Sequence, residues 1–113
     1  MRRLIALALT ILVAGAAVGA AQGASAVKTI TGVVGPGFTI SMNKKSVKAG
    51  KYKIVITDKS RIHNFHLRGP GFNKRTSVVK KGKTTWTVTL KKGTYRFVCD
   101  PHAAAMKGTL KVT

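Results

Sequence analysis

Acidic side chains are almost absent from this chain of 113 residues. It contains no glutamate, and Asp58 and Asp100 are its only acids, against 21 lysines and arginines. The shortage excludes catalysis by paired carboxylates, which needs two acids at one substrate, and it argues against a calcium site built from carboxylates. The glutamate general acid/base of zinc deaminases is missing too, as is their Cys-x-x-Cys motif. Any chemistry of this chain must come from other side chains.

Cysteine occurs only once, at Cys99, so the chain cannot form an internal disulfide. A lone cysteine is most often a small buried apolar residue of a strand. Here Asp100, Pro101 and His102 follow directly, and Met106 lies four residues further on. This spacing favours metal ligation over simple core packing.

Helical periodicity of useful length is also lacking. Short β-branched segments bounded by turn residues predict about eight strands instead, as does the alternation of Trp86, Val88 and Leu90 with threonines. The predicted strands are 28–34, 38–42, 53–58, 62–67, 76–79, 84–90, 94–99 and 109–113. Such regular short strands indicate an all-β fold, a β-sandwich whose two sheets bury their inner faces against each other.

A short motif occurs twice along the chain. Gly35-Pro36-Gly37-Phe38 is repeated as Gly69-Pro70-Gly71-Phe72. We interpret the repeat as shared turn chemistry before two strands, because Gly and Pro supply the backbone angles of tight reversals.

The first 26 residues are typical of an export signal. Arg2 and Arg3 give a positive start, an apolar run follows, and Ala24-Ser25-Ala26 is a small-residue cleavage site. The alternative is an uncleaved membrane anchor, because residues 4–21 carry no charge. We therefore expect one domain, residues 27–113, in the periplasm, the cell envelope or the extracellular space.

Positive charge dominates this expected domain, which keeps 19 of the 21 basic residues and both acids, for a formal charge of +17. Such a potential should attract acidic redox partner proteins, anionic membranes or acidic wall polymers. Nucleic acid would bind only without specificity, because aromatic residues are few and the chain is expected to be exported.

Cys99, His102 and Met106 place a thiolate, an imidazole and a thioether within eight residues. Copper accepts all three, whereas zinc gains little from a thioether and calcium requires oxygen. Pro101 stiffens the loop between the first two. A fourth ligand must come from elsewhere, and His63 and His66 compete for that position. On a strand, residues three apart point to opposite faces, so only one of them should bind.

At these residues the chain resembles the cupredoxins, the small blue-copper family that includes plastocyanin, pseudoazurin and amicyanin. The resemblance covers residues 27–113. It is carried by the His63-Asn64 pair, by the run from Gly93 to Cys99, and by Met106-Lys107-Gly108-Thr109-Leu110. One departure is that three residues separate His102 from Met106, where plastocyanin-like loops usually have four and amicyanin-like loops two.

The resemblance implies a Greek-key β-sandwich and one type 1 copper ion bound by His63, Cys99, His102 and Met106, which favours His63 over His66. It also implies that the Asn64 side chain ties together the two ligand-bearing loops. The expected protein is a monomer that carries single electrons between partners and is not an enzyme. Three alternatives remain open: an envelope copper carrier or scavenger, a metal-free domain that binds acidic surfaces, and, more distantly, catalysis by Cys99 with His102.

Overall fold

The computed structural model describes Gly15 and residues 26–113. The predicted export signal therefore lies outside the described residues, apart from Gly15 and Ala26. Within the described part, no helix has the length and apolar character needed to cross a membrane.

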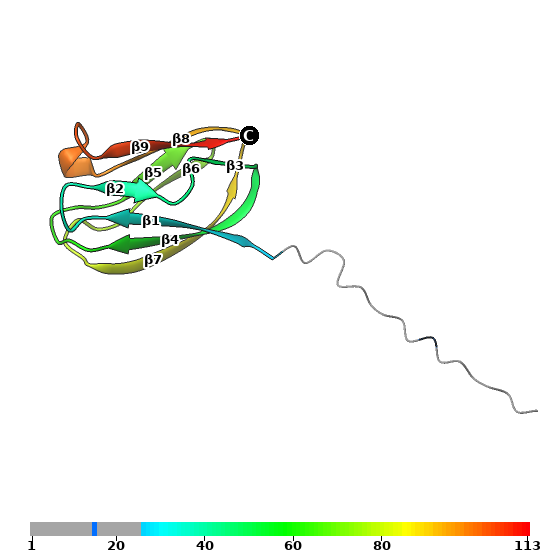
Figure 1. Ribbon diagram of the computed structural model, residues 1–113, viewed down its shortest axis with the longest axis horizontal. Coiled ribbons are helices and arrows are strands. Elements are labelled where there is room, and N and C mark those ends of the chain that lie inside the picture. The colour runs from blue at the N-terminus through cyan, green and yellow to red at the C-terminus, as the bar shows by residue number, and fades with distance from the viewer. Residues whose placement is uncertain (1–14, 16–25) are drawn as a thin grey trace, which may run out of the picture.

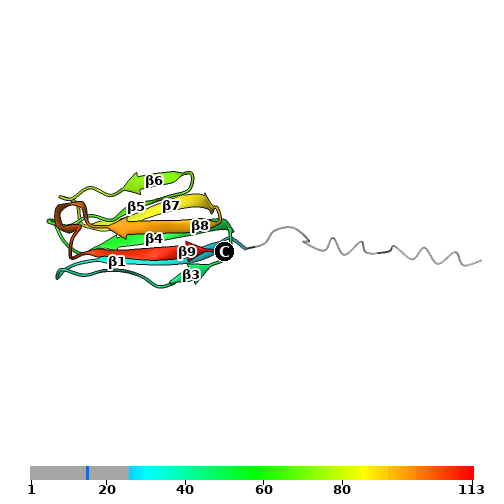
Figure 2. The same cartoon turned by 90° about the horizontal axis from the view of Figure 1, so that it is seen from above.

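The described residues form two packed β-sheets, drawn one above the other in Figure 1 and from a perpendicular direction in Figure 2. The first sheet has the order β2-β1-β4-β7 and the second the order β3-β9-β8-β5-β6. In chain order, the elements of the fold are β1 (Lys28–Val34), β2 (Ile40–Met42), β3 (Ser46–Val47), β4 (Gly50–Asp58), β5 (His66–Gly69), β6 (Phe72–Arg75), β7 (Gly82–Leu90), β8 (Gly93–Val98), the short 3-10 helix η1 (Asp100–His102) and β9 (Lys107–Val112).

Both sheets are mixed. The pairs β1–β4 and β3–β9 are parallel, and the other neighbouring strands are antiparallel. Strands alternate between buried and more exposed residues, so that β4 turns Tyr52, Ile54 and Ile56 into the core while Lys53 and Val55 between them face outward. Each fully buried large apolar side chain contributes about 1.5–3 kcal/mol to folding. The predicted all-β sandwich is confirmed.

The strand predicted at 76–79 is wrong. Pro70 and Gly71, which has a φ of 68°, make a tight turn directly after β5, so the chain re-enters the sheet at once as β6. By residue 76 that hairpin is complete. Thr76 then donates its backbone N–H to the carbonyl oxygen of Phe65, and the chain turns away. Strand β3 was also missed, because two residues are too short to show any period.

The repeated Gly-Pro-Gly-Phe motif adopts two different conformations. In the first copy the positive φ belongs to Gly35 and the Gly35–Pro36 bond is cis, whereas in the second it belongs to Gly71. Both copies join antiparallel paired strands, β1 to β2 and β5 to β6. The predicted chain reversal before a strand is therefore confirmed for both copies, but the two do not share their backbone angles.

Three loops meet at one end of the sandwich, which we call the loop end: residues 35–39, 59–65 and 99–106. The register explains the meeting, because Val34 at the end of β1 lies beside Asp58 at the end of β4, and His66 at the start of β5 lies beside Val98 at the end of β8. In Figure 1 this end is on the left, where η1 is drawn in orange. Segments far apart in the sequence thus contribute side chains to one place.

Candidate metal centre

His63, Cys99 and His102 lie together at the loop end, each supplied by a loop that the sheets hold in place. Cys99 directly follows β8 and is fully buried, and His102 ends η1 and is half-buried. His63 is fully buried in the loop between β4 and β5. The sequence predicted all three residues, and the structure brings them together.

The donor atoms of these three residues form a nearly equilateral triangle. The two Nδ1 atoms are 3.1 Å apart, and the Cys99 Sγ lies 3.6 Å from each of them. The point in their plane that is equally distant from all three lies about 2.0 Å from each, close to the length of a bond from a first-row metal ion to imidazole nitrogen, about 2.0–2.1 Å. Two nitrogens and one thiolate arranged as a triangle are the equatorial donors of a blue-copper site.

Met106 closes the loop that carries Cys99 and His102. Its side chain is 1 % exposed. Its backbone N–H donates to the carbonyl oxygen of His102 at 2.8 Å, and its own carbonyl oxygen accepts from the backbone N–H of Cys99 at 3.0 Å. These bonds fix the three residues relative to one another.

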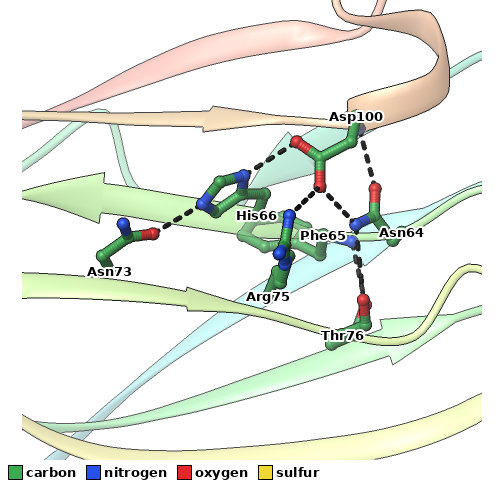
Figure 3. A network of polar contacts seen from close by, with 7 residues as sticks. All are labelled: Asn64, Phe65, His66, Asn73, Arg75, Thr76 and Asp100. Atoms are coloured by element: carbon green, nitrogen blue, oxygen red, sulfur yellow. Dashed lines mark hydrogen bonds and ion pairs between the residues drawn. The ribbon is translucent and has the colours of Figure 1, made fainter.

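Asn64 ties the loop of His63 to the loop of Cys99, as the family resemblance implies. Its side-chain oxygen accepts a 2.8 Å hydrogen bond from the backbone N–H of Asp100, and its Nδ2 donates to the Asp100 Oδ2 at 2.7 Å (Figure 3). Nδ2 also lies 3.3 Å from the carbonyl oxygen of Thr76. Because Asn64 follows His63 and Asp100 follows Cys99, this reciprocal pair sets the spacing of two candidate ligands.

His66 lies outside the donor triangle. Its Nδ1 is 2.8 Å from the Asp100 Oδ1 and its Nε2 is 2.6 Å from the Asn73 Oδ1 (Figure 3). The choice of His63 over His66 agrees with this arrangement, but the parity argument behind it is wrong, because His63 precedes β5 and is not in a strand. The strand predicted at 62–67 is therefore observed as β5, which begins only at His66, four residues after the predicted start.

Asp100 is the centre of this polar network, and Arg75 adds an Nη1 atom 3.8 Å from its Oδ2. Burial alone would raise the pKa of the Asp100 carboxyl. The hydrogen bonds from Asn64 and His66 and the charges of His66 and Arg75 outweigh burial and lower that pKa below its usual 3.8. The carboxylate beside Cys99 is thus held in its charged form.

Asp58 has the opposite electrostatic character. Burial raises its pKa above 3.8, and this is only partly opposed by the hydrogen bond from the Ser60 backbone N–H and by the nearby His63. Its Oδ2 and the His63 Nε2 are both buried without a protein partner among the described residues. His63 therefore presents Nδ1 to the triangle and Nε2 to the protein interior.

Phe38 is a neighbour of the triangle that the sequence did not reveal. Its ring meets the His63 and His102 rings edge to face, with centroids 5.2 and 4.9 Å apart, although 63 % of the residue is exposed. The only hint was its position at the end of a Gly-Pro-Gly turn. An exposed aromatic ring so placed shields the imidazoles from one side.

Family and fold comparisons agree with this geometry. A family model described as a cupredoxin-like domain matches residues 4–112. The chain belongs to the cupredoxin-like family. A search of curated protein sequences found no match.

Solved structures with the same fold include several cupredoxins. Reduced rusticyanin is 23% identical, with 75% of this chain and 78% of that protein covered and a TM-score of 0.59. An azurin, Az-iso2 of Methylomonas sp. strain J, is 20% identical over 76% of this chain and 98% of its own, with a TM-score of 0.56. A copper(I) form of an amicyanin variant is 19% identical over 75% and 82%, also with a TM-score of 0.56.

Within this cupredoxin fold, the arrangement of His63, Cys99, His102 and Met106 fits one type 1 copper ion. The three polar donors lie within 4.8 Å of one another, and a buried thioether follows on the same loop. When bound, copper would supply a reversible one-electron couple. The protein would supply the donor set and a largely water-free surrounding.

Proposed function

We propose that this cupredoxin is an exported blue-copper protein that carries single electrons between redox partners. In this proposal Cys99, His63 and His102 would hold the copper ion, and Met106 would add a weaker fourth ligand. The observation that supports it best is the triangle of donor atoms, whose centre is about one metal–nitrogen bond length from each.

Electron transfer requires ligands that move little when the metal changes its charge. Here Pro101 lies in η1, and backbone hydrogen bonds link Cys99 to Met106 and Met106 to His102. The Asn64–Asp100 pair holds the His63 loop against the Cys99 loop. A site held by so many independent contacts favours electron transfer over the rival role of a copper carrier, which must release its metal.

The path of the electron is suggested by differences in burial. His63, Cys99 and Met106 are each no more than 1 % exposed, whereas His102 is half-buried and thus reaches the surface. We assign the transfer of electrons to the His102 edge, beside the exposed ring of Phe38. The buried ligands keep water away from the metal.

The same ligand set argues against an enzyme. Catalytic metal sites keep one coordination position free for water or substrate. Four protein ligands would leave none, so we propose that the protein makes and breaks no substrate bonds.

The remaining parts of the proposal concern the setting of the protein. Residues 1–26 would act as a cleaved export signal, leaving residues 27–113 as a monomeric domain outside the cytoplasmic membrane. Its formal charge of +17 suits an acidic redox partner.

Titration of the purified protein with Cu(II) tests the site directly. One equivalent should produce an intense visible band, because a thiolate bound to Cu(II) gives strong charge transfer. Cys99→Ser should abolish that band, because a serine oxygen cannot supply it. His63→Ala should weaken or abolish it, whereas His66→Ala, which removes a histidine outside the triangle, should keep it.

Two results would contradict the proposal. A band that survives Cys99→Ser, or one more sensitive to His66→Ala than to His63→Ala, would show that the ligands are assigned wrongly. A further measurement separates electron transfer from copper delivery. An electron carrier should keep its copper through repeated one-electron reduction and oxidation, whereas a copper carrier should lose the metal to a chelator after reduction.

A further inference from the structure

The outer surface of the second sheet concentrates the arginines of this protein. Leu67, Tyr95, Phe97 and Leu110 point into the core, so their strand neighbours point outward. The register aligns these outward residues in rows across the sheet. We call the positively charged members the arginine face: Arg68, Arg75, Arg96, Lys107 and Lys111. Three of the four arginines between residues 27 and 113 are here.

Arg68 and Arg96 lie directly opposite each other on β5 and β8, and both are exposed. Like charges in directly opposed positions destabilise an antiparallel pair. The one carboxylate near this face, Asp100, is already engaged by Asn64, His66 and Arg75. Arg68 and Arg96 therefore form a cationic pair for which the described residues supply no anion.

The outer surface of the first sheet is different in kind. There β7 exposes Thr85, Thr87 and Thr89, and β4 exposes Lys51 and Lys53. No arginine lies on those two strands. The concentration of guanidinium groups is thus a property of one face and does not follow from the general basicity of the chain.

The arginine face also contains a hollow of about 550 Å³, lined in part by Arg68, Arg96, Val98, Ala103 and Lys107. Val98 directly precedes Cys99, and Ala103 directly follows His102. A group that filled the hollow would therefore lie beside the loop that carries two of the proposed copper ligands.

We propose that the arginine face is the docking site for an acidic segment of a redox partner protein. Arg68 and Arg96 bind carboxylates of that segment. This proposal rests on the proposed function for the identity of the partner, but not for the binding itself. A guanidinium group binds a carboxylate through two parallel hydrogen bonds, a geometry that lysine cannot reproduce.

A membrane surface suits this face less well than a protein does. Proteins that lie on membranes usually insert apolar side chains below the headgroups. Among the described residues, the exposed large hydrophobic ones are Val27, Phe38, Ile62 and Val79, and none of them lies on β5, β8 or β9. The hollow favours a protruding segment over a flat lipid surface.

The test is the binding of a fluorescent peptide of eight glutamates to the purified full chain, with and without copper, followed by fluorescence anisotropy. The double variant Arg68→Gln with Arg96→Gln should weaken binding by about tenfold or more. The matched control, Lys51→Gln with Lys53→Gln, removes the same charge from the opposite sheet and should change binding less than about threefold. Arg68→Lys with Arg96→Lys keeps the charge and should still lose most of the affinity.

The possible outcomes separate this inference from the copper assignment. Equal losses in the Arg→Gln variant and its lysine control would overturn the docking site, because charge alone would then explain the binding. Stronger, arginine-dependent binding to phosphatidylglycerol vesicles than to the peptide would also overturn it, in favour of a membrane. If the arginine variants alone lose affinity for the peptide in the absence of copper, the docking site is supported even if Cu(II) gives no visible band. Variants that unfold on heating at the same temperature as the wild type have kept their fold, so their loss of binding is not a loss of folding.

Discussion

At the scale of single residues, Met106 should tune the metal centre more than assemble it. The axial thioether of such centres is a long, weak bond, whereas the equatorial donors hold the ion. Met106→Leu keeps a similar volume in a site that is 1 % exposed. We therefore expect the variant to retain one copper ion and its visible band, with a reduction potential shifted upward, because Cu(II) loses an electron donor. Absorption and redox titration measure both, and complete loss of copper would contradict the axial assignment.

The two carboxylates should give stability opposite dependences on pH. The pKa of Asp100 is lowered in the folded protein, so its contribution to stability is present above 3.8 and is lost as the pH falls from 3.8 through the folded pKa. The pKa of Asp58 is raised by burial, so its contribution is full below 3.8 and is lost as the pH rises through the folded pKa. The two effects therefore occupy different pH ranges.

Urea unfolding of the copper-free protein between about pH 7 and about pH 3 should separate these effects. Asp58→Asn should remove a gain in unfolding free energy that the wild type shows on moderate acidification. Asp100→Asn should remove a loss that the wild type shows below about pH 4. All other ionisable groups are common to the three proteins, so differences between curves isolate each carboxyl. Curves that run parallel to the wild type would contradict the assigned shifts.

At the scale of strands, glycine permits close packing between β9 and its neighbour β8. A Cβ atom added at Gly108 would clash with the Phe97 ring, whereas one at Gly37 would meet nothing within 4 Å. Phe97 lies directly opposite Gly108 and is 6 % exposed. The aromatic ring therefore occupies the space that a side chain at position 108 would need.

Gly108→Ala should accordingly lower the free energy of unfolding by about 1–3 kcal/mol, the usual cost of overpacking. Gly37→Ala, the matched control on the loop end, should change it by less than about 0.5 kcal/mol. Chemical denaturation of the two variants without copper makes the comparison. Equal stabilities would mean that Phe97 can move aside at little cost.

The sequence predicted those strands whose pattern is local. It placed β1 at its observed bounds and β7 and β8 within two residues, because alternation of apolar and polar residues is visible over six or more positions. It failed at β5 and β6, a hairpin closed by the two residues Pro70 and Gly71. The hairpin β5–β6 was misplaced, because the pattern before it extended a strand through His63, whereas the fold uses that stretch as a loop fixed by Asn64 and Thr76.

The candidate site shows the same division. Cys99, His102 and Met106 could be found because they lie close together in the sequence, and His63 through the family pattern. Phe38, the buried carboxyl of Asp58 and the opposed pair Arg68 and Arg96 could not be found. Their significance depends on which loops and strands become neighbours, and the register that decides this is a property of the sheets.

At the scale of the whole molecule, charge should govern how fast partners meet, while contacts govern where they dock. A formal charge of +17 for residues 27–113 extends a positive potential well beyond the surface. Lys80, Lys81 and Lys83 lie at the start of β7 or just before it, and the register places that start beside Asp58 at the loop end. They can therefore attract an acidic partner toward the proposed copper site without touching its ligands.

Association with an acidic electron acceptor should slow steeply as salt shortens the screening length from about 30 Å at 0.01 M to about 8 Å at 0.15 M. Replacing Lys80, Lys81 and Lys83 with glutamine should lower the association rate at low salt and flatten its salt dependence, because long-range attraction depends on total charge near the approach path. Absorption and potential should stay unchanged, which serves as the control for an intact metal site. Stopped-flow measurements at several salt concentrations supply the rates. Rates indifferent to both salt and mutation would mean that the positive charge serves adhesion to a surface, since a steered encounter cannot be insensitive to screening.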